Sequence, residues 1–262
     1  MVTVPVWAVD TLRAAGVDTP EFDAAQLFAA AGSCDDEVFA GYVKRRADRE
    51  PLQYILGEWD FFDMTLKVGP GVLCPRADTE FVAEQAILRG PFFDVLDLCS
   101  GSGCIALAIA RFCKGARVSA VEKSKEAFFY LQQNIDLYGE GRVKGVMADA
   151  FTYQDTCRQT YDLIISNPPY LTSREMKELS PETAAEPAMA LQADDDGLAF
   201  YKHITAAYKP LLRDGGLLIF EIGYTQAEAV VALLSDSGYD NIQVMKDYGQ
   251  NDRFVCGVKS AK

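Results

Sequence analysis

Residues Asn167-Pro168-Pro169-Tyr170 are the part of this chain whose types and order best suit chemistry. They follow an apolar run that is typical of a buried strand. Pro168 excludes Asn167 from helical backbone angles, and neither proline donates an N–H, so the turn is stiff and its carbonyl groups point outward unpaired. The Asn167 side-chain oxygen and the Pro168 carbonyl are therefore predicted to offer two acceptors to one planar NH2 group, beside the aromatic face of Tyr170.

A glycine-rich turn precedes this motif. Residues 97–103 read Asp-Leu-Cys-Ser-Gly-Ser-Gly and lead into an apolar helical segment. Glycine lets the backbone approach a ligand closely, and a helix N-terminus presents free N–H groups. The turn is neither GxGxxG nor a P-loop, which favours a nucleoside-type ligand without a bound pyrophosphate. Any tight strand-to-helix turn also uses Gly and Ser, so a purely structural role stays open. The predicted ligand-contacting residues are Cys99, Ser100, Gly101, Ser102 and Gly103.

Two acidic residues end the next two predicted strands. Glu122 is placed to accept the ribose hydroxyls of a nucleoside, as acids do at this point of dinucleotide-binding folds. Asp149 is placed to accept from the exocyclic amine of adenine. Open α/β sheets bind ligands at the carboxyl ends of their strands, where these acids, the glycine turn and Asn167 would meet. The sequence therefore predicts a nucleoside pocket at this edge.

These residues need a sheet to position them, and the pattern after about residue 75 supplies one. Short β-type runs alternate there with segments of helical period, which predicts a parallel sheet wrapped by helices on both faces. The runs are residues 93–100, 117–122, 143–149, 161–167 and 215–223. Two further strands, 241–247 and 252–259, are separated by a connection too short for a crossover helix, so the last strand should run antiparallel. The predicted fold class is α/β with a seven-stranded sheet.

The N-terminal part has a different pattern. Residues 1 to about 50 read as short amphipathic helices, and residues 52–76 read as a β-hairpin bent near Phe62-Asp63. We expect a helical substrate-recognition domain (1–58), a hairpin connector (59–74) and an α/β domain (75–262). The N-terminal helices and the long loop 171–187 are candidates for holding a protein partner.

Composition excludes several classes of function. The formal net charge of -13 disfavours non-specific nucleic-acid binding and would suit a basic partner, although acidity also serves solubility. The single histidine, His203, argues against a zinc site and a Ser-His-Asp hydrolase, so no metal is expected. No run approaches the ~20 apolar residues of a membrane span, and no signal-peptide layout is present. We expect a soluble cytoplasmic monomer.

The glycine turn, Glu122 and the Asn-Pro-Pro-Tyr motif together resemble class I S-adenosylmethionine-dependent methyltransferases that alkylate a planar amino or amide nitrogen. Further blocks resemble, in order and spacing, the PrmC/HemK family of peptide-chain release factor glutamine N5-methyltransferases: EPLQYILGEWDF, LCPRADTE, AEPAMALQADDDGLAFYKHI, FEIGYTQ and DYGQNDR. The resemblance runs from about residue 50 to the C-terminus. Adenine N6-methyltransferases share NPPY, but the PRADTE and EP…DG blocks separate the two families.

The resemblance implies a Rossmann-like fold, S-adenosylmethionine as donor with S-adenosylhomocysteine as product, and no metal. The substrate would be the glutamine in the Gly-Gly-Gln motif of class I release factors. In this scheme Asn167, Pro168 and Tyr170 are catalytic; residues Cys99 to Gly103, Glu122, Asp149 and Asn167 bind the cofactor; and Asn167, Pro168, Pro169, Tyr170 and Glu186 bind the substrate. Glu186 would help to shape the glutamine channel.

The chain departs from the family pattern at three points. Cys99-Ser100 replace the usual Gly-Thr, Glu122 replaces Asp, and Ala150 stands where many relatives carry an aromatic that stacks on adenine; Phe151 is a candidate substitute. We expect these changes to affect cofactor affinity rather than the reaction. Two alternatives remain: an N6-adenine methyltransferase of DNA or RNA, which the acidity disfavours, and a non-catalytic cofactor-binding scaffold.

Overall fold

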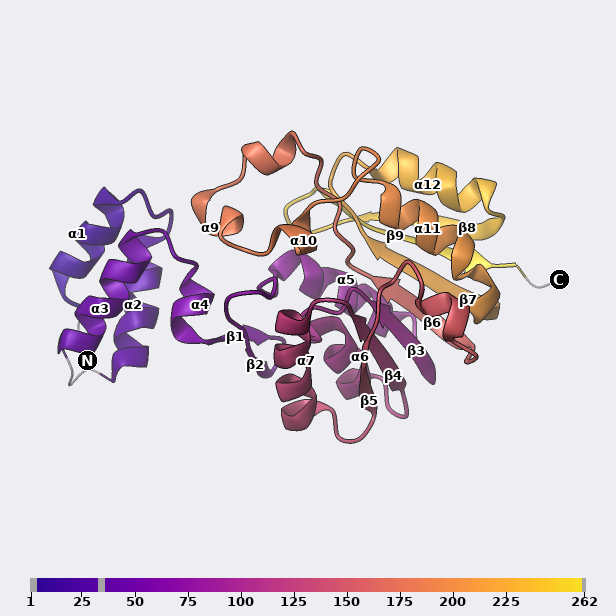
Figure 1. Cartoon of the computed structure of the whole chain (residues 1–262), viewed down its shortest axis with the longest axis horizontal. Helices are drawn as coiled ribbons and strands as arrows, with labels where there is room; N and C mark the ends of the chain where they lie inside the picture. The colour runs from indigo at the N-terminus through magenta and orange to yellow at the C-terminus, as the bar shows by residue number, and fades with distance from the viewer. Residues whose placement is uncertain (1–3, 33–35, 261–262) are drawn as a thin grey trace.

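The computed structural model describes residues 4–32 and 36–260. It has two parts, and Figure 1 shows the N-terminal helices at one end and the larger α/β part at the other, with a small hairpin between them. No helix in the described ranges is long and apolar enough to cross a membrane.

The N-terminal part is a small helical bundle. Its helices are α1 (Val6–Ala14), α2 (Pro20–Ala31), α3 (Asp36–Ala47) and α4 (Leu52–Leu56). Pro20 starts α2 at a position where a missing N–H costs nothing, and Gly32 ends it in the left-handed conformation. The bundle has its own core, in which Leu12, Leu27 and Phe39 are almost fully buried.

Helix α4 differs from the prediction, which included its residues in the hairpin segment. Leu52 and Ile55 are three residues apart and both pack into the bundle core, so a helical turn buries them together where a strand would separate them. Gly57, with φ of 75°, ends the helix.

The hairpin consists of β1 (Glu58–Phe61) and β2 (Met64–Lys67). Phe61 pairs with Met64, so the turn falls at Phe62-Asp63, as the sequence predicts. Phe61, Met64 and Leu66 are buried in the core of the α/β part. The hairpin therefore packs on the α/β part and connects it to the N-terminal bundle.

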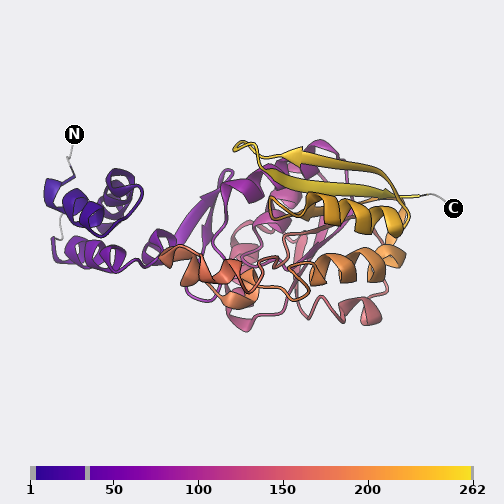
Figure 2. The same ribbon diagram turned by 90° about the horizontal axis from the view of Figure 1, so that it is seen from above.

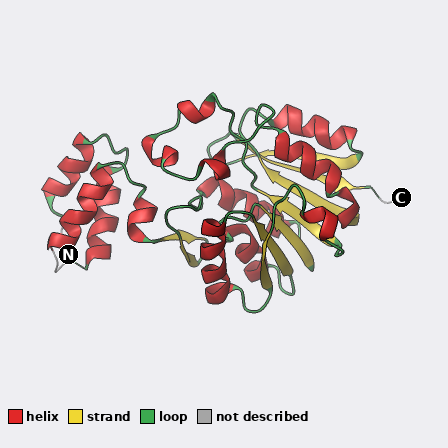
Figure 3. Ribbon diagram, viewed as in Figure 1, coloured by secondary structure: helices red, strands yellow, loops and turns green. Residues whose placement is uncertain are grey.

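The α/β part is built on one seven-stranded sheet in the order β5-β4-β3-β6-β7-β9-β8. The strands are β3 (Asp94–Leu98), β4 (Arg117–Glu122), β5 (Val143–Met147), β6 (Tyr161–Ser166), β7 (Leu212–Glu221), β8 (Tyr239–Lys246) and β9 (Asp252–Lys259). Strand β9 is antiparallel to both β7 and β8, which confirms the prediction for the last strand. Figure 3 shows the twisted sheet between its helices.

Helices cover both faces of the sheet. The helices that follow the hairpin are α5 (Ala77–Leu88), α6 (Cys104–Phe112), α7 (Lys125–Tyr138), α8 (Tyr153–Thr156), α9 (Pro181–Ala184), α10 (Ala188–Leu191), α11 (Ala199–Ala207) and α12 (Ala227–Asp236). Helices α5 to α7 contribute to the hydrophobic core on one face, and α11 and α12 to the core on the other. Helix α6 is buried from Cys104 to Ala110, and its residues there are apolar on all sides.

A long excursion leaves the sheet after β6. Residues 171–198 contain only short helices, including α9 and α10. Figures 1 and 2 both show this segment reaching from the sheet toward the N-terminal helices. The segment thus lies over the sheet edge where the candidate residues gather.

Candidate active site

A cleft lies at the carboxyl ends of β3 to β6. Its empty space amounts to about 1000 Å³, including space open to solvent. The predicted residues that line it are Cys99, Ser100, Gly101, Ser102, Glu122, Asp149, Asn167 and Pro169. Four other predicted residues, Gly103, Pro168, Tyr170 and Glu186, are not part of its lining.

The glycine turn has the backbone shape that close ligand approach requires. Gly101 has φ of 55°, and a Cβ added to it would meet no protein atom within 4 Å, so the space beside it is open to a ligand. Gly103, with φ of 84°, is closely packed: its added Cβ would lie 2.5 Å from Leu131 Cδ1 on α7. Cys99 also has a positive φ, 60°, a conformation that costs a residue with a side chain about 1 kcal/mol.

Glu122 joins two parts of the cleft wall. Its Oε2 accepts from the Gly101 amide at 2.8 Å, and its Oε1 accepts from the Ser124 amide at 2.7 Å. Each carboxylate oxygen keeps a second lone pair. Glu122 therefore holds the glycine turn and the start of α7 and keeps acceptor capacity at the cleft wall.

Asp149 lies just beyond the end of the neighbouring strand β5 and is held by two contacts. Its Oδ1 accepts from the Phe151 amide at 2.9 Å, and its Oδ2 pairs with Lys123 Nζ at 2.9 Å. Burial raises the pKa of Asp149, but these two partners outweigh burial, so the pKa lies below its ordinary value. The carboxylate stays ionised and acts as an acceptor.

An aromatic wall stands beside Asp149. Phe151 lines the cleft and packs against Phe200 of α11 with ring centroids 4.7 Å apart; the His203 ring lies behind Phe151 at the same distance. Phe151, the candidate substitute for the aromatic missing at Ala150, therefore lies in the cleft wall, and its contact with a base stays a prediction. Phe200 also lines the cleft and was not predicted, because only the tertiary packing of α11 brings it there.

Asn167 is oriented by a buried polar chain. Its Nδ2 donates to Thr79 Oγ1 at 3.2 Å, and Thr79 Oγ1 donates to Glu221 Oε2 at 2.8 Å. Within the described residues no protein group donates to Asn167 Oδ1. Neither Thr79 nor Glu221 was singled out from the sequence, although both lie in the blocks that carry the family resemblance.

The rest of the motif is fixed through its backbone. The Tyr170 amide donates to the Leu191 carbonyl at 3.1 Å, and the Tyr170 carbonyl accepts from Gln226 Nε2 at 3.0 Å. Among described residues, no N–H donates to the Pro168 carbonyl. Gly197 packs so closely that an added Cβ would lie 2.3 Å from the Tyr170 carbonyl oxygen. The motif is thus held in place at Tyr170, and within residues 4–32 and 36–260 neither predicted acceptor receives a hydrogen bond from the protein.

Glu186 lies beneath the cleft rim. It accepts from the Cys74 amide at 3.1 Å and forms an ion pair with Arg76. Burial raises the pKa of Glu186, and Arg76 offsets part of that effect. Glu186 therefore ties the excursion 171–198 to residues 74–76, and its part in a substrate channel stays a prediction.

Two further polar residues lie beside the glycine turn and were not predicted as site residues. Asn134 of α7 donates to the carbonyls of Ser102 at 2.9 Å and Lys67 at 3.0 Å, which joins the glycine turn to the hairpin. Both carboxylate oxygens of Asp97 are buried without a partner in the described chain. Burial raises the pKa of Asp97 to about 7.

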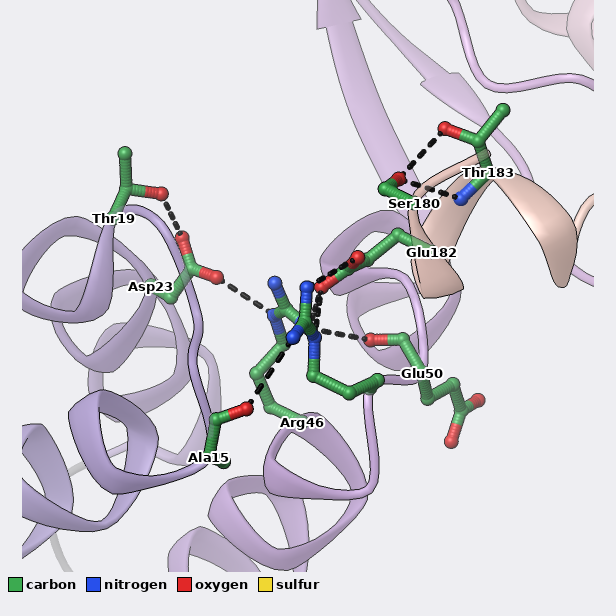
Figure 4. A network of polar contacts seen from close by, with 9 residues as sticks. Ala15, Thr19, Asp23, Arg46, Glu50, Ser180, Glu182 and Thr183 are labelled. Carbon is green, nitrogen blue, oxygen red and sulfur yellow. Dashed lines mark hydrogen bonds and ion pairs between the residues drawn. The ribbon is translucent and has the colours of Figure 1, made fainter. Parts of the chain in front are cut away.

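An ion-pair cluster joins the excursion to the N-terminal bundle (Figure 4). Glu182 of α9 accepts from Arg49 at 2.6 Å and 2.8 Å and pairs with Arg46 of α3 at 2.8 Å. Arg46 is almost fully buried and also donates to Asp23 of α2 at 2.7 Å. Burial would raise the pKa of Glu182, but the bonds from Arg49 and Arg46 outweigh it and lower the pKa to about 2. We call Asp23, Arg46, Arg49 and Glu182 the clasp.

In the described ranges, no three His, Cys, Asp or Glu side chains are grouped to hold a metal ion.

Comparison with known proteins agrees with this geometry. Residues 78–219 match the family described as Methyltransferase small domain. A crystal structure of a methyltransferase from Pyrococcus furiosus, 18% identical, has a TM-score of 0.58 over 76% of this chain and 91% of that one. The fold is that of a class I methyltransferase.

Two relatives narrow the assignment. The release factor glutamine methyltransferase of Fusobacterium nucleatum is 40% identical over 226 residues, which cover 84% of this chain and 63% of that protein. That of Caulobacter vibrioides is 33% identical over 282 residues, which cover 98% of this chain and 96% of that protein. The chain spans less than two thirds of the first relative and nearly all of the second. It belongs to the release factor glutamine methyltransferase family.

Proposed function

We propose that this protein transfers the methyl group of S-adenosylmethionine to the side-chain amide nitrogen of the glutamine in the Gly-Gly-Gln motif of class I release factors. The observation that carries the proposal is the pair of free acceptors on the stiff motif, Asn167 Oδ1 and the Pro168 carbonyl. Family membership supports the same substrate.

The cleft residues fit the cofactor. Glu122 would accept from the ribose hydroxyls, Asp149 from the adenine amine, and Phe151 with Phe200 would pack against the base. The open space beside Gly101 would admit the donor close to the backbone. When bound, S-adenosylmethionine supplies an electrophilic methyl group on a positively charged sulfur.

The acceptor pair would act on the nucleophile. An amide nitrogen is a poor nucleophile because its lone pair is delocalised into the carbonyl. Asn167 and the Pro168 carbonyl would accept its two hydrogens, orient the nitrogen and stabilise the positive charge that builds on it. The amide nitrogen would form its bond to the methyl carbon as the S–C bond of the donor breaks, and the electron pair of that bond would remain on sulfur. The nitrogen then releases one proton to solvent, so no general base is needed before transfer.

The substrate protein would be held by the helical unit. We propose residues 1–58 as a recognition domain, 59–74 as its connector and 75–262 as the catalytic domain. The separate core of the bundle supports this division, and the clasp supports a role for the bundle in placing the excursion beside the substrate. The net charge of -13 is more compatible with a protein partner than with a nucleic acid.

Labelled methyl transfer tests the proposal. The protein is incubated with S-adenosylmethionine carrying a labelled methyl group and a class I release factor, with or without the Gly-Gly-Gln glutamine replaced. We expect label in the intact factor alone. Equal labelling of both factors would refute the substrate assignment, and labelling of DNA or RNA adenine would favour the adenine methyltransferase. Calorimetry that detects no cofactor binding would favour the scaffold.

A further inference from the structure

A buried series of hydrogen bonds runs from Asn167 through Thr79 to Glu221. We infer that Thr79 and Glu221 are positioning residues that hold the Asn167 amide with its oxygen toward the cleft and its NH2 group toward Thr79. The inference rests on the proposed function, in which the Asn167 oxygen acts as an acceptor.

The donor and acceptor in each of these two hydrogen bonds follow from counting protons. An ionised carboxylate can only accept, so Glu221 Oε2 takes the single hydroxyl proton of Thr79 across 2.8 Å. Thr79 Oγ1 then has only lone pairs to offer Asn167. The group that faces it at 3.2 Å must therefore be the NH2 group of Asn167, which leaves the oxygen on the other side. The ionisation of Glu221 thus selects one of the two amide orientations.

Burial gives this selection its strength. Thr79 is 3% exposed and Glu221 is 2% exposed, so bulk water cannot substitute for either partner. Other groups face Glu221 from the packed elements: Arg253 from β9, Asp78 from α5, Arg76 before α5, and the phenol of Tyr170. Tyr201 donates to the Glu221 backbone carbonyl at 3.0 Å, and Cys104 lies nearby on α6. None of these groups forms a hydrogen bond to the Glu221 carboxylate within the described residues. Thr79 is therefore the one hydrogen-bond donor to this carboxylate among them.

Protonation of Glu221 would reverse the donor and acceptor roles in this series of hydrogen bonds. The carboxylic acid can donate to Thr79, whose hydroxyl is then free to donate to Asn167 Oδ1. The Asn167 amide would then flip, so that its NH2 group faces the NH2 group of the substrate. An NH2 group cannot accept a hydrogen bond from the substrate NH2 group. Burial raises the pKa of Glu221 to about 7, and the Thr79 hydrogen bond opposes that rise. The productive orientation is therefore present above this pKa and lost as the pH falls through it.

We call the hydrogen-bonded series Asn167, Thr79 and Glu221 the relay. Four variants test it by methyl transfer to the release factor. Thr79→Val removes the hydroxyl, and we expect kcat to fall about 10-fold or more with cofactor Kd little changed. Thr79→Ser restores the hydroxyl and should restore the rate. Thr205→Val is the matched control, because Thr205 is also buried and its hydroxyl has no partner in the described chain; it should keep the wild-type rate. Glu221→Gln should lower kcat and remove its rise with pH between about 6 and 8.

Several results would overturn the inference. They are a wild-type kcat in Thr79→Val, equal losses in Thr79→Val and Thr79→Ser, or an unchanged pH profile in Glu221→Gln. If Thr79→Val does not fold, the Glu221→Gln profile decides.

A second readout needs no activity. The side-chain amide protons of Asn167, assigned by their loss in Asn167→Asp, should show an NMR Overhauser effect to the Thr79 methyl group at about pH 8. This effect should weaken at about pH 6 in the wild type but not in Glu221→Gln. An effect that is independent of pH or absent throughout would refute the relay. Wild-type protein that shows the NMR change but no methyl transfer would instead refute the proposed function.

Discussion

At the residue scale, the environment of Tyr170 explains why sequence blocks far apart in the chain occur together. Gln226 accepts from the Gly223 amide and donates to the Tyr170 carbonyl, and Gly197 lies against that same carbonyl. Burial raises the pKa of the Tyr170 phenol, so the ring stays neutral. The ADDDG and FEIGYTQ blocks therefore fix the position of the NPPY motif.

The Tyr170 ring should contribute by packing rather than by its hydroxyl. We expect Tyr170→Ala to lower kcat/KM for the release factor by about 10-fold or more, because the substrate side chain loses an aromatic surface. Tyr170→Phe keeps that surface and should lose much less. Steady-state kinetics on the two variants compare them directly, and equal losses would assign the effect to the hydroxyl.

Gly197 should be intolerant of even one added carbon. It has φ of 80°, and an added Cβ would lie 2.3 Å from the Tyr170 carbonyl oxygen. We expect Gly197→Ala to displace the motif and lower kcat by about 10-fold or more. Gly215→Ala is the matched control, since Gly215 has φ of 78° but open space around it. The control should lose only about 1 kcal/mol of stability. Equal activities in the two variants would show that the contact at Tyr170 does not matter.

At the element scale, the clasp fixes the position of the excursion 171–198 relative to the N-terminal bundle. Arg46 is buried with Asp23 and Glu182 as its acid partners, so removal of one partner leaves its charge only partly compensated. The clasp joins the two segments that we expect to hold the protein substrate. Its loss should therefore affect recognition more than chemistry.

Glu182→Gln tests this role. We expect a loss of about 1–3 kcal/mol in the stability of the contact and a higher KM for the release factor, with kcat little changed. Hydrogen exchange should rise in residues 171–198. The matched control is Glu178→Gln, because Glu178 lies in the same segment but its pair with Arg174 is exposed. A KM equal to that of the control would contradict the role of the clasp.

How far the elements could be predicted depends on whether their signal is local. Strands β3 to β7 were predictable because each is a short apolar run, and the antiparallel β9 followed from a short connection. Helix α4 was mistaken for part of the hairpin because its aromatic and β-branched composition is typical of strands, and only contact with the bundle core makes it helical.

The residues of the candidate site were also predictable only where their signal is local in the sequence. The residues that follow a strand at the shared sheet edge were found from the sequence, and these are Cys99, Ser100, Gly101, Ser102, Glu122, Asp149 and Asn167. Thr79, Phe200 and Asn134 were missed because their contacts join segments that are distant in sequence. The ion pairs of the clasp have no local sequence signal for the same reason.

At the scale of the whole molecule, two buried acids influence how stability depends on pH. Burial raises the pKa of Asp97 and of Glu221 to about 7, above their unfolded values of 3.8 and 4.5. A raised pKa means that the folded state binds the proton more tightly. The stability that each proton provides is therefore fully present below the unfolded pKa and is lost as the pH rises through about 7.

Glu221→Gln should remove one of these two dependences. At about pH 8 we expect the variant to be more stable than the wild type, by up to about 3 kcal/mol, because it no longer buries that charge. The gain should disappear toward about pH 4, where Glu221 is protonated in both folded and unfolded states. Denaturant unfolding across this range measures the difference, and a variant less stable at every pH would show that the charge stabilises the fold.

In the proposed reaction two oxygens, one from Asn167 and one from Pro168, would hold the reacting amide. Single-turnover methyl transfer to the release factor, with cofactor bound in advance, isolates that step. Asn167→Ala removes one acceptor, and we expect its rate to fall by about 100-fold or more while the cofactor Kd changes little. A variant that transfers the methyl group at the wild-type rate would contradict the account.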